Sequence, residues 1–397
     1  MNKYNLTLKG DRVIWGIFIL LSMLSLAVVY SASGYLAYRH ENGSALFYLF
    51  KQLSIVVSGF AVMYLTHRVK YTHFSAASKV VIWLVIPVLI ITLLLGVNVN
   101  NASRWLVIPG INISFQSSDF AKIVLLTYLA RALSRLPDKN KEGKDILQYV
   151  LLHIFAPTII ITLLILKSNL STAAIIFVSA FFMMIIGGLK PKFLIFLAGS
   201  GIVIASFGYL LVKVNPNILP RFDTWVNRIE NFNTDDPDVN YQVIQAKIAI
   251  ASNPLIGKLP GKSSQRAFLP SAHADFIYAI IIEEYGTIVA FLITALYLAL
   301  FFRALIIAKH SQTTFGALLA IGLTFTLVIQ AMINMGVAVS ILPVTGQPLP
   351  LLSSGGTSFI FTSMALGMIQ SVKAGIDLKE EKKAKEDAAN SLTNVLN

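Results

Sequence analysis

The fold is decided by residues 275 to 302, which read DFIYAIIIEEYGTIVAFLITALYLALFF. Apart from three acidic side chains, this stretch is uncharged and mostly apolar. A helix needs about 20 such residues to cross the hydrocarbon core of a bilayer. The stretch therefore predicts a transmembrane helix, and further apolar runs predict the same at 13–36, 47–66, 80–96, 118–134, 151–166, 170–188, 193–212, 314–337 and 356–376.

The composition agrees with this interpretation. Of 397 residues, 56% are hydrophobic and only 13% are charged, whereas a soluble protein has about 25% charged residues. The mean hydropathy is +0.71. These values exclude a cytoplasmic enzyme, a disordered regulator and a fibrous repeat, and they predict an all-α polytopic membrane protein with about ten transmembrane helices. Because the chain has no cysteine, disulfides, thiolate metal sites and cysteine nucleophiles are excluded.

The net charge of +13 does not indicate a nucleic-acid partner, because the 32 Lys and Arg residues are scattered between the apolar runs. If the N-terminus is cytoplasmic, twenty of them fall in the inner loops and the two tails. Only Arg39, Arg104 and Lys167 fall in the short outer loops. This is the bias of the positive-inside rule, so we expect a multi-pass plasma-membrane protein with both termini in the cytoplasm.

One outer segment, residues 213 to 274, is much longer than the other outer loops. Asp236 and Pro237 suit a helix start, and apolar residues recur at helical spacing up to Asn253. The pattern predicts an amphipathic helix that lies either on the outer membrane surface or over the bundle. Residues 257 to 263, GKLPGKS, resemble a phosphate-binding loop, but they have three residues between the glycines instead of four. We therefore expect no nucleotide site there, and we expect residues 378 to 397 to form a solvated cytoplasmic tail.

Ionisable residues inside spans are costly, so each is a candidate for function. Asp119 and Lys122 are three residues apart at the start of a span and can neutralise each other on one helix face. Lys51 lies one turn inside another span and reaches either the headgroups or a ligand. Arg104 is either a contact for lipid phosphate or, together with Lys122, part of a cationic site at the outer face.

The stretch quoted first carries three acids with different surroundings. Asp275 opens its span near water, at the mouth of the bundle, and is well placed for chemistry. Glu283 and Glu284 follow about 12 Å deeper, where they must be protonated or paired with another helix; a structural role is the preferred interpretation. His273 is either a partner of Asp275 or an interfacial residue. Residues 353 to 358 form a Gly- and hydroxyl-rich helix start, which is either an anion site or an ordinary cap.

Several of these segments, in this order, resemble the SEDS family of bacterial cell-wall proteins (shape, elongation, division and sporulation), which includes FtsW and RodA. With ten spans and a large outer loop, the resemblance covers nearly the whole chain. Asn169 is a departure, because the family usually has Asp there. The matching segments are Arg104–Leu106, Phe115–Lys122, Phe268–Pro270, His273–Tyr278, Glu283–Gly286, Thr345–Pro350 and Ser353–Ser358.

The resemblance implies a peptidoglycan glycosyltransferase that polymerises lipid II during cell division. It also implies a septal location and, as partners, a class B penicillin-binding protein and other division proteins. Joining an α-linked pyrophosphate donor into a β-1,4 chain inverts the anomeric carbon, which requires one base and positive charge at the leaving group. We expect Asp275 to be that base, Arg104 and Lys122 to face the pyrophosphate, and Asp119 to orient Lys122. Further candidates for substrate contacts are Lys51, Lys262, Arg266, Ser354 and Thr357.

This chemistry requires no cofactor and no metal. A divalent ion, Mg²⁺ or Mn²⁺, between Asp275 and the pyrophosphate is an open alternative, although the sequence offers no multi-ligand cluster. The competing function is a flippase for lipid-linked precursors, in which Glu283 and Glu284 would relay protons. An elongation-type role is also open, although the run from Pro260 to Arg266 looks more like division-type members.

Overall fold

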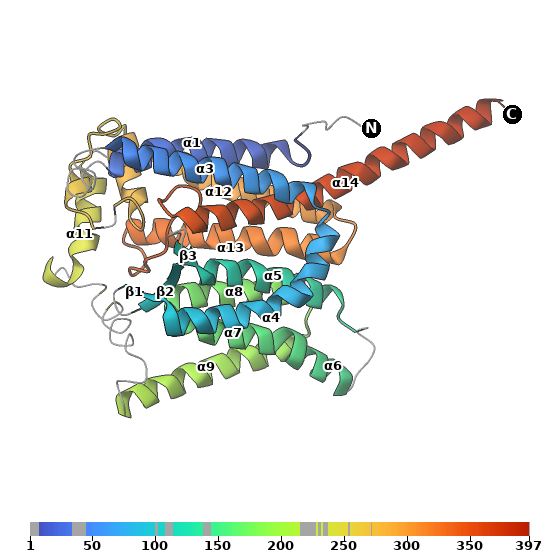
Figure 1. The fold of residues 1–397 in the computed structure, drawn as a ribbon, viewed down its shortest axis with the longest axis horizontal. Coiled ribbons are helices and arrows are strands. Elements are labelled where there is room, and N and C mark those ends of the chain that lie inside the picture. The colour runs from blue at the N-terminus through green and yellow to red at the C-terminus, as the bar shows by residue number, and fades with distance from the viewer. Residues whose placement is uncertain are drawn as a thin grey trace.

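The computed structural model describes residues 8–33, 45–99, 102–107, 114–137, 144–214, 228, 232, 237–252, 255–270 and 272–396. Figure 1 shows a bundle of long helices that run side by side in alternating directions. One end of the bundle carries a small sheet and helix α11, and we call it the sheet end. At the other end α14 projects from the bundle, and we call it the tail end. The helices are α1 (Arg12–Ala32), α3 (Ala45–Arg68), α4 (Tyr71–Leu95), α5 (Ser117–Ser134), α6 (Lys144–Val150), α7 (Ala156–Leu166), α8 (Leu170–Ile186), α9 (Pro191–Val214), α11 (Pro237–Ala251), α12 (Ile277–His310), α13 (Thr314–Ala338) and α14 (Gly356–Leu396), with a π-helical turn, Leu151–Phe155, joining α6 to α7.

Ten helical segments of the described chain occupy the ten predicted spans. Seven are long and apolar enough to cross a membrane: α1, α3, α4, α6 with α7, α12, α13 and α14. Helix α8 is apolar but has only 17 residues, and α5 carries three charged residues in its 18. Helix α9 fills the remaining predicted span. The prediction of an all-α polytopic fold is thus confirmed.

A three-stranded antiparallel sheet at the sheet end was not predicted. Its strands are β1 (Val97–Val99), β2 (Ala102–Val107) and β3 (Ser114–Gln116), in the order β1-β2-β3. Trp105 of β2 pairs with Gln116 of β3, and α5 begins directly after β3. Strands of three to six residues are too short to leave a period in the sequence. The sheet fixes where α5 starts, and therefore where Asp119 and Lys122 lie.

Helix α12 is not continuous. At Gly286 the backbone has φ 81° and ψ 170°, a region that is essentially reserved for glycine. A Cβ at this position would lie 2.2 Å from the carbonyl oxygen of Leu255. The break admits the main chain of the outer loop, whose Lys258 N and Leu259 N donate to the carbonyl oxygens of Glu283 and Glu284 at 2.9 Å each.

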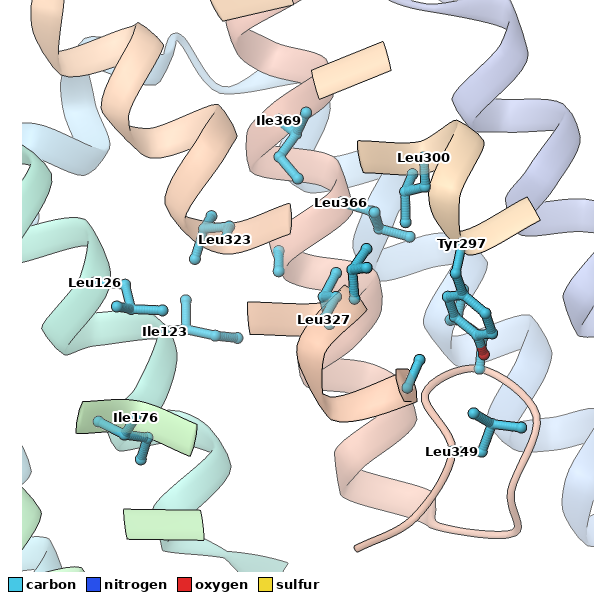
Figure 2. Close-up of a cluster of buried hydrophobic side chains, with 14 of the residues drawn as sticks. Ile123, Leu126, Ile176, Tyr297, Leu300, Leu323, Leu327, Leu349, Leu366 and Ile369 are labelled. Atoms are coloured by element: carbon cyan, nitrogen blue, oxygen red, sulfur yellow. The ribbon is translucent and has the colours of Figure 1, made fainter. Parts of the chain in front are cut away.

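The segment between α13 and α14, residues 339 to 355, folds back into the sheet end. Leu349 and Leu352 are buried in the main apolar core, and Figure 2 shows Leu349 in this segment with the hydroxyl of Tyr297 directed toward it. Tyr297 on α12 donates a hydrogen bond to the carbonyl oxygen of Pro350. Ser25 on α1 donates to the carbonyl oxygen of Leu352 at 3.0 Å. We call residues 339 to 355 the re-entrant segment.

The predicted helix of the long outer loop is α11. It packs against α12 at the sheet end, with Val243, Ala246 and Ala249 buried, and it runs across the direction of the spans (Figure 1). Packing over the bundle is one of the two arrangements that its pattern allowed. At the other end, α14 continues far beyond the core, and Lys379 to Lys385 are exposed.

Candidate functional site

Asp275 stands in the turn just before α12 and is half-buried. Its main-chain oxygen accepts a hydrogen bond of 2.8 Å from Asn334 Nδ2 on α13. The same nitrogen donates to the carbonyl oxygen of Gln347 at 2.7 Å. A Cβ placed on Gly346, whose φ is +66°, would lie 3.5 Å from Asp275 Oδ2. The main chain of Asp275 is therefore held beside the re-entrant segment, and the positive φ of Gly346, rather than lack of space, favours a glycine there.

The re-entrant segment is tied to the turn that carries Asp275. Ser353 Oγ donates to the carbonyl oxygen of Ala274 at 2.6 Å and accepts from Leu349 N at 2.7 Å. Ser354 N donates to the carbonyl oxygen of His273 at 2.9 Å. Thr357 Oγ1, by contrast, accepts from Gln116 N at 3.4 Å and connects α14 to β3. The start of α14 thus lies next to Asp275, and the roles predicted for Ser354 and Thr357 stay predictions.

Asp119 and Lys122 form the ion pair that their spacing predicted, with Nζ 3.3 Å from Oδ1. Both side chains are buried, at 6% and 8% exposure. Lys122 Nζ also donates to Gln330 Oε1 at 2.8 Å, and Gln330 Nε2 donates to the carbonyl oxygen of Pro348 at 3.0 Å. Through Pro348 this network joins the ion pair to the re-entrant segment. Gln330 also lies one helical turn before Asn334, which bonds to the main chain of Asp275.

Buried atoms usually find partners, yet Asp119 Oδ2 has no hydrogen-bond partner among the described residues. Lys122 shares its amine between Asp119 and Gln330, so it is already engaged. Its predicted contact with a pyrophosphate stays a prediction. Arg104 lies in β2, but its side chain is outside the described residues.

Lys51 lies at the rim of this site. It is exposed on α3, and its charge acts on His273. Burial is the main cause that lowers the pKa of His273, and the charge of Lys51 lowers it further. The next residue, Gln52, is buried and donates to Ser25 Oγ at 2.7 Å, which fixes the turn of α3 that carries Lys51.

Arg228 is the cation that sequence reasoning missed. Its Nη1 donates to the carbonyl oxygen of Val344 at 3.0 Å. Burial lowers the pKa of Arg228, and the negative charge of Asp275 opposes that change. Arg228 borders a cleft of about 240 Å³. The walls of this cleft are mostly apolar side chains of α8 and α13, including Ile175, Ile329 and Ile333. Nothing in the sequence distinguishes this arginine from the other cations of the long loop, because only its contacts bring it to Asp275.

Glu283 and Glu284 are buried, and of the two, within the described part of the chain, only Glu284 is bonded to another span, by the hydroxyl of Ser31 on α1. Residues 255 to 270, which we call the wrapping loop, enclose them. Glu283 Oε1 accepts from Lys258 Nζ at 2.8 Å, from Ser264 N at 3.0 Å and from Ser264 Oγ at 2.8 Å. Glu284 Oε1 accepts from Ser263 N at 3.2 Å. The expectation of a partner helix was wrong for Glu283, because its charge is met by donors of the loop.

The two basic residues predicted for the wrapping loop differ in their surroundings. Arg266 Nη1 donates to the carbonyl oxygen of Ser31, at the end of α1, at 3.3 Å, whereas Lys262 is exposed. Ser31 also donates from its hydroxyl to Glu284. Arg266 therefore helps to fasten the loop to α1, and Lys262 is accessible. Their contacts with substrate stay predictions.

Asn169, the departure from the family pattern, has a clear structural task. It is the N-cap of α8, and its side-chain oxygen accepts from Thr172 N at 3.3 Å. Thr172 Oγ1 accepts in turn from Gln347 Nε2 of the re-entrant segment at 3.0 Å. An Asn caps a helix as well as an Asp does, so the position keeps its place in the network.

Among the described residues, no group of three His, Asp or Glu is arranged to hold a metal. A divalent ion stays an untested alternative.

The sequence of this chain is similar to those of known proteins over most of its length. Residues 11–376 match the model of the cell cycle protein family of FtsW, RodA and SpoVE. A relative from Trichlorobacter lovleyi, named "Probable peptidoglycan glycosyltransferase FtsW", is 30% identical over 372 residues, covering 93% of this chain and 94% of its own length. The peptidoglycan glycosyltransferase MrdB of Escherichia coli K12 is 30% identical over 370 residues, covering 91% of this chain and 94% of its own.

Two solved structures share the fold. A chain from a peptidoglycan synthase complex superposes with a TM-score of 0.71 at 22% identity, covering 93% of this chain and 99% of its own. The rod shape determining protein RodA of Thermus thermophilus superposes with a TM-score of 0.63 at 22% identity, covering 92% and 96%. With a family match over most of its length and relatives at 30% identity, this chain belongs to the FtsW, RodA and SpoVE family of cell cycle proteins.

Proposed function

We propose that this protein is a peptidoglycan glycosyltransferase that joins the disaccharide units of lipid II into glycan strands. The observation that carries the proposal is the setting of Asp275: a half-buried carboxylate beside Gly346, influenced by the charge of Arg228, at the edge of a mostly apolar cleft. Relatives over nearly the whole chain carry the name of this activity.

The reaction is a single displacement at the anomeric carbon. Asp275 accepts the proton of the acceptor hydroxyl while the hydroxyl oxygen forms the new bond to that carbon. The bond from the same carbon to the pyrophosphate oxygen breaks, and its electron pair leaves with the polyprenyl pyrophosphate. General-base assistance of this kind contributes about a hundredfold to ten-thousandfold in rate.

Cations and an apolar surface are required by the other half of the substrate. Arg228 is placed to stabilise the charge that develops on the leaving pyrophosphate, since a half-buried guanidinium forms charge-assisted hydrogen bonds to phosphate oxygens. The cleft beside it, about 240 Å³ in volume, offers apolar contact to the first isoprene units. Lys51 at the rim and the exposed Lys262 are further candidates for the pyrophosphate and the headgroup.

The test is polymerisation of pure lipid II by protein in lipid vesicles. Asp275→Asn keeps the size of the side chain but removes the base, so we expect it to lose at least about a hundredfold in rate. Asp145→Asn, an exposed acid at the tail end, is the matched control and should polymerise normally. Normal polymerisation by Asp275→Asn would end the assignment, and headgroup translocation without polymer would favour a flippase.

The partner and the location extend the same proposal. We infer that the sheet end faces the cell exterior, where the glycan is extended, and that a class B penicillin-binding protein crosslinks the product. A division role at the septum is the preferred assignment, although relatives of both the FtsW and MrdB types are 30% identical to this chain. A fluorescent fusion that follows the side wall instead of the septum would assign the elongation role.

A further inference from the structure

A cavity that Asp275 does not line is present among the described residues. It lies at the tail end, has a volume of about 900 Å³, and is formed by the segment before α1, the end of α3, the start of α4 and α14. None of the described residues that line it is acidic. Its wall instead carries five cations: Lys9, Arg68, Lys70, Lys379 and Lys382.

Three acids near this cavity pair with other cations, and Glu380, next to Lys379, is exposed to solvent. Glu381 also feels the charge of Lys9 at longer range, but it is exposed and bonded elsewhere. The pairs are Asp11 with Arg303, Asp377 with Lys373 and Glu381 with Lys385. In the part of the chain that the structure describes, the four lysines of the cavity form no ion pair, so the cavity keeps a surplus of positive charge.

The start of α4 adds to this surplus. Lys70 occupies the N-cap position and no side chain caps the first turn. The first amide groups of a helix carry a partial positive charge, which favours an anion. Tyr71 and Thr72 of this turn line the cavity. Lysines and a helix start therefore act on the same space with the same sign.

The depth of the cavity selects the kind of anion. It lies where two candidate membrane helices end and begin, at Arg68 and Tyr71, which is the level of lipid headgroups. On the half of α3 nearer the tail end, Val57 and Leu65 are 59% and 65% exposed, and helical spacing places them on the side that ends at Arg68, within about 17 Å of it. A phospholipid whose acyl chain lay along this apolar face would bring its phosphate to the cavity. An acidic peptide would have no acyl chain to contact the face.

We propose that this cavity binds the headgroup of an anionic phospholipid from the adjacent leaflet, with the lysines around the phosphate and the acyl chains along the exposed face of α3. Basic pockets between membrane helices are known to bind such headgroups. The proposal does not depend on the polymerase activity, because it concerns the opposite end of the bundle. With the orientation inferred above, the leaflet is the cytoplasmic one.

The experiment measures lipid binding by the full chain in neutral detergent micelles. The probes are dioleoyl phosphatidylglycerol, dioleoyl phosphatidylcholine and inorganic phosphate. The cavity variant is Lys70→Gln with Lys379→Gln, and the matched control, which removes the same charge at the same end, is Lys309→Gln with Lys383→Gln. Because all four side chains are exposed, equal thermal midpoints in detergent will show that both variants are folded.

We expect phosphatidylglycerol to bind saturably and phosphatidylcholine not to bind. The cavity variant should weaken phosphatidylglycerol binding about tenfold or more, since each basic residue near a lipid phosphate contributes about 1 kcal/mol, and the control should change it less than about twofold. Equal weakening in both variants would mean diffuse attraction and would overturn the site. Inorganic phosphate binding as tightly as the lipid would also overturn it, because the face of α3 would then contribute nothing.

Discussion

Replacing Glu283 with Gln should release the wrapping loop while leaving the bundle intact. Every contact of this carboxylate is a donor, and its side chain is fully buried, at 0% exposure. Glu283 Oε1 accepts three bonds of 2.8 to 3.0 Å, from Lys258 Nζ, Ser264 N and Ser264 Oγ. A Gln keeps one oxygen but loses the charge, and it replaces the other oxygen, which accepts from Ser263 Oγ and Gln265 N, with an NH2 donor. A bond to a charged acceptor is worth about 1 kcal/mol more than a neutral one. From the three bonds to Oε1 alone we therefore expect a loss of at least about 3 kcal/mol.

Hydrogen exchange measures this loss directly, because loop amides exchange through local opening. A change of about 3 kcal/mol corresponds to exchange more than about a hundredfold faster across residues 257 to 266. Lys258→Met is the informative control. Its side chain is 27% exposed, so water screens the pair and we expect less than about 1 kcal/mol. Unchanged exchange in Glu283→Gln would refute the reasoning, and equal effects in the two variants would mean that the ion pair, rather than the serine donors, holds the loop.

Three further predictions concern the ion pair of Asp119 with Lys122, the titration of His273 and the orientation of the protein in the membrane. Asp119→Asn and Lys122→Met should each cost several kcal/mol of stability, about 3 to 5 for a buried pair, and a double-mutant cycle should give a coupling above about 0.5 kcal/mol; additive effects would mean that the side chains do not interact. Since the pKa of His273 is lowered by burial and by Lys51, the folded protein binds fewer protons than the unfolded chain, so stability falls as pH drops below about 6.5. In His273→Gln the thermal midpoint should depend less on pH between about pH 7 and 5. A pH profile equal to that of the unmodified protein would contradict this. In intact cells an impermeant thiol reagent should label Ile256→Cys and spare Lys309→Cys; both are exposed, the first in the loop bonded to the start of α12 and the second in the last turn of α12. The reverse pattern would invert the proposed orientation.

The spans could be predicted from the sequence because one signal dominates them. A helix in a bilayer must satisfy its own backbone, so a run of about 20 apolar residues has few alternatives. The same reasoning located Asp119 and Lys122 on one helix face, since three residues along a helix is a fixed geometry, and the ion pair at 3.3 Å confirms it. Short-range helical geometry is thus readable without a structure.

Contacts between a loop and a helix were not readable in this way. Arg228 reaches Val344 across 116 residues, and Gln330 reaches Lys122 across 208. No local period records such pairs, and the polar side chains involved do not stand out from others in their segments. The sequence therefore indicated Asp275 and its neighbours along the chain, but it could not indicate Arg228, Gln330 or Asn334, which contact them through the fold.

The wrapping loop is not a nucleotide site, but its backbone binds an anion in the way a phosphate-binding loop does. Residues 257 to 263 have the wrong spacing for a nucleotide, yet glycines at φ +84° and +82° and successive amides of Ser264 and Gln265 make it an anion-binding loop. These amides donate to Glu283 at 3.0 and 3.4 Å, so the anion is the chain's own carboxylate. Because Glu283 lies about 12 Å along α12 from Asp275, the same loop that buries one acid also restrains the helix start that presents the other. The backbone amides of this loop therefore bind a carboxylate of the chain itself, and in doing so they help to position the candidate site.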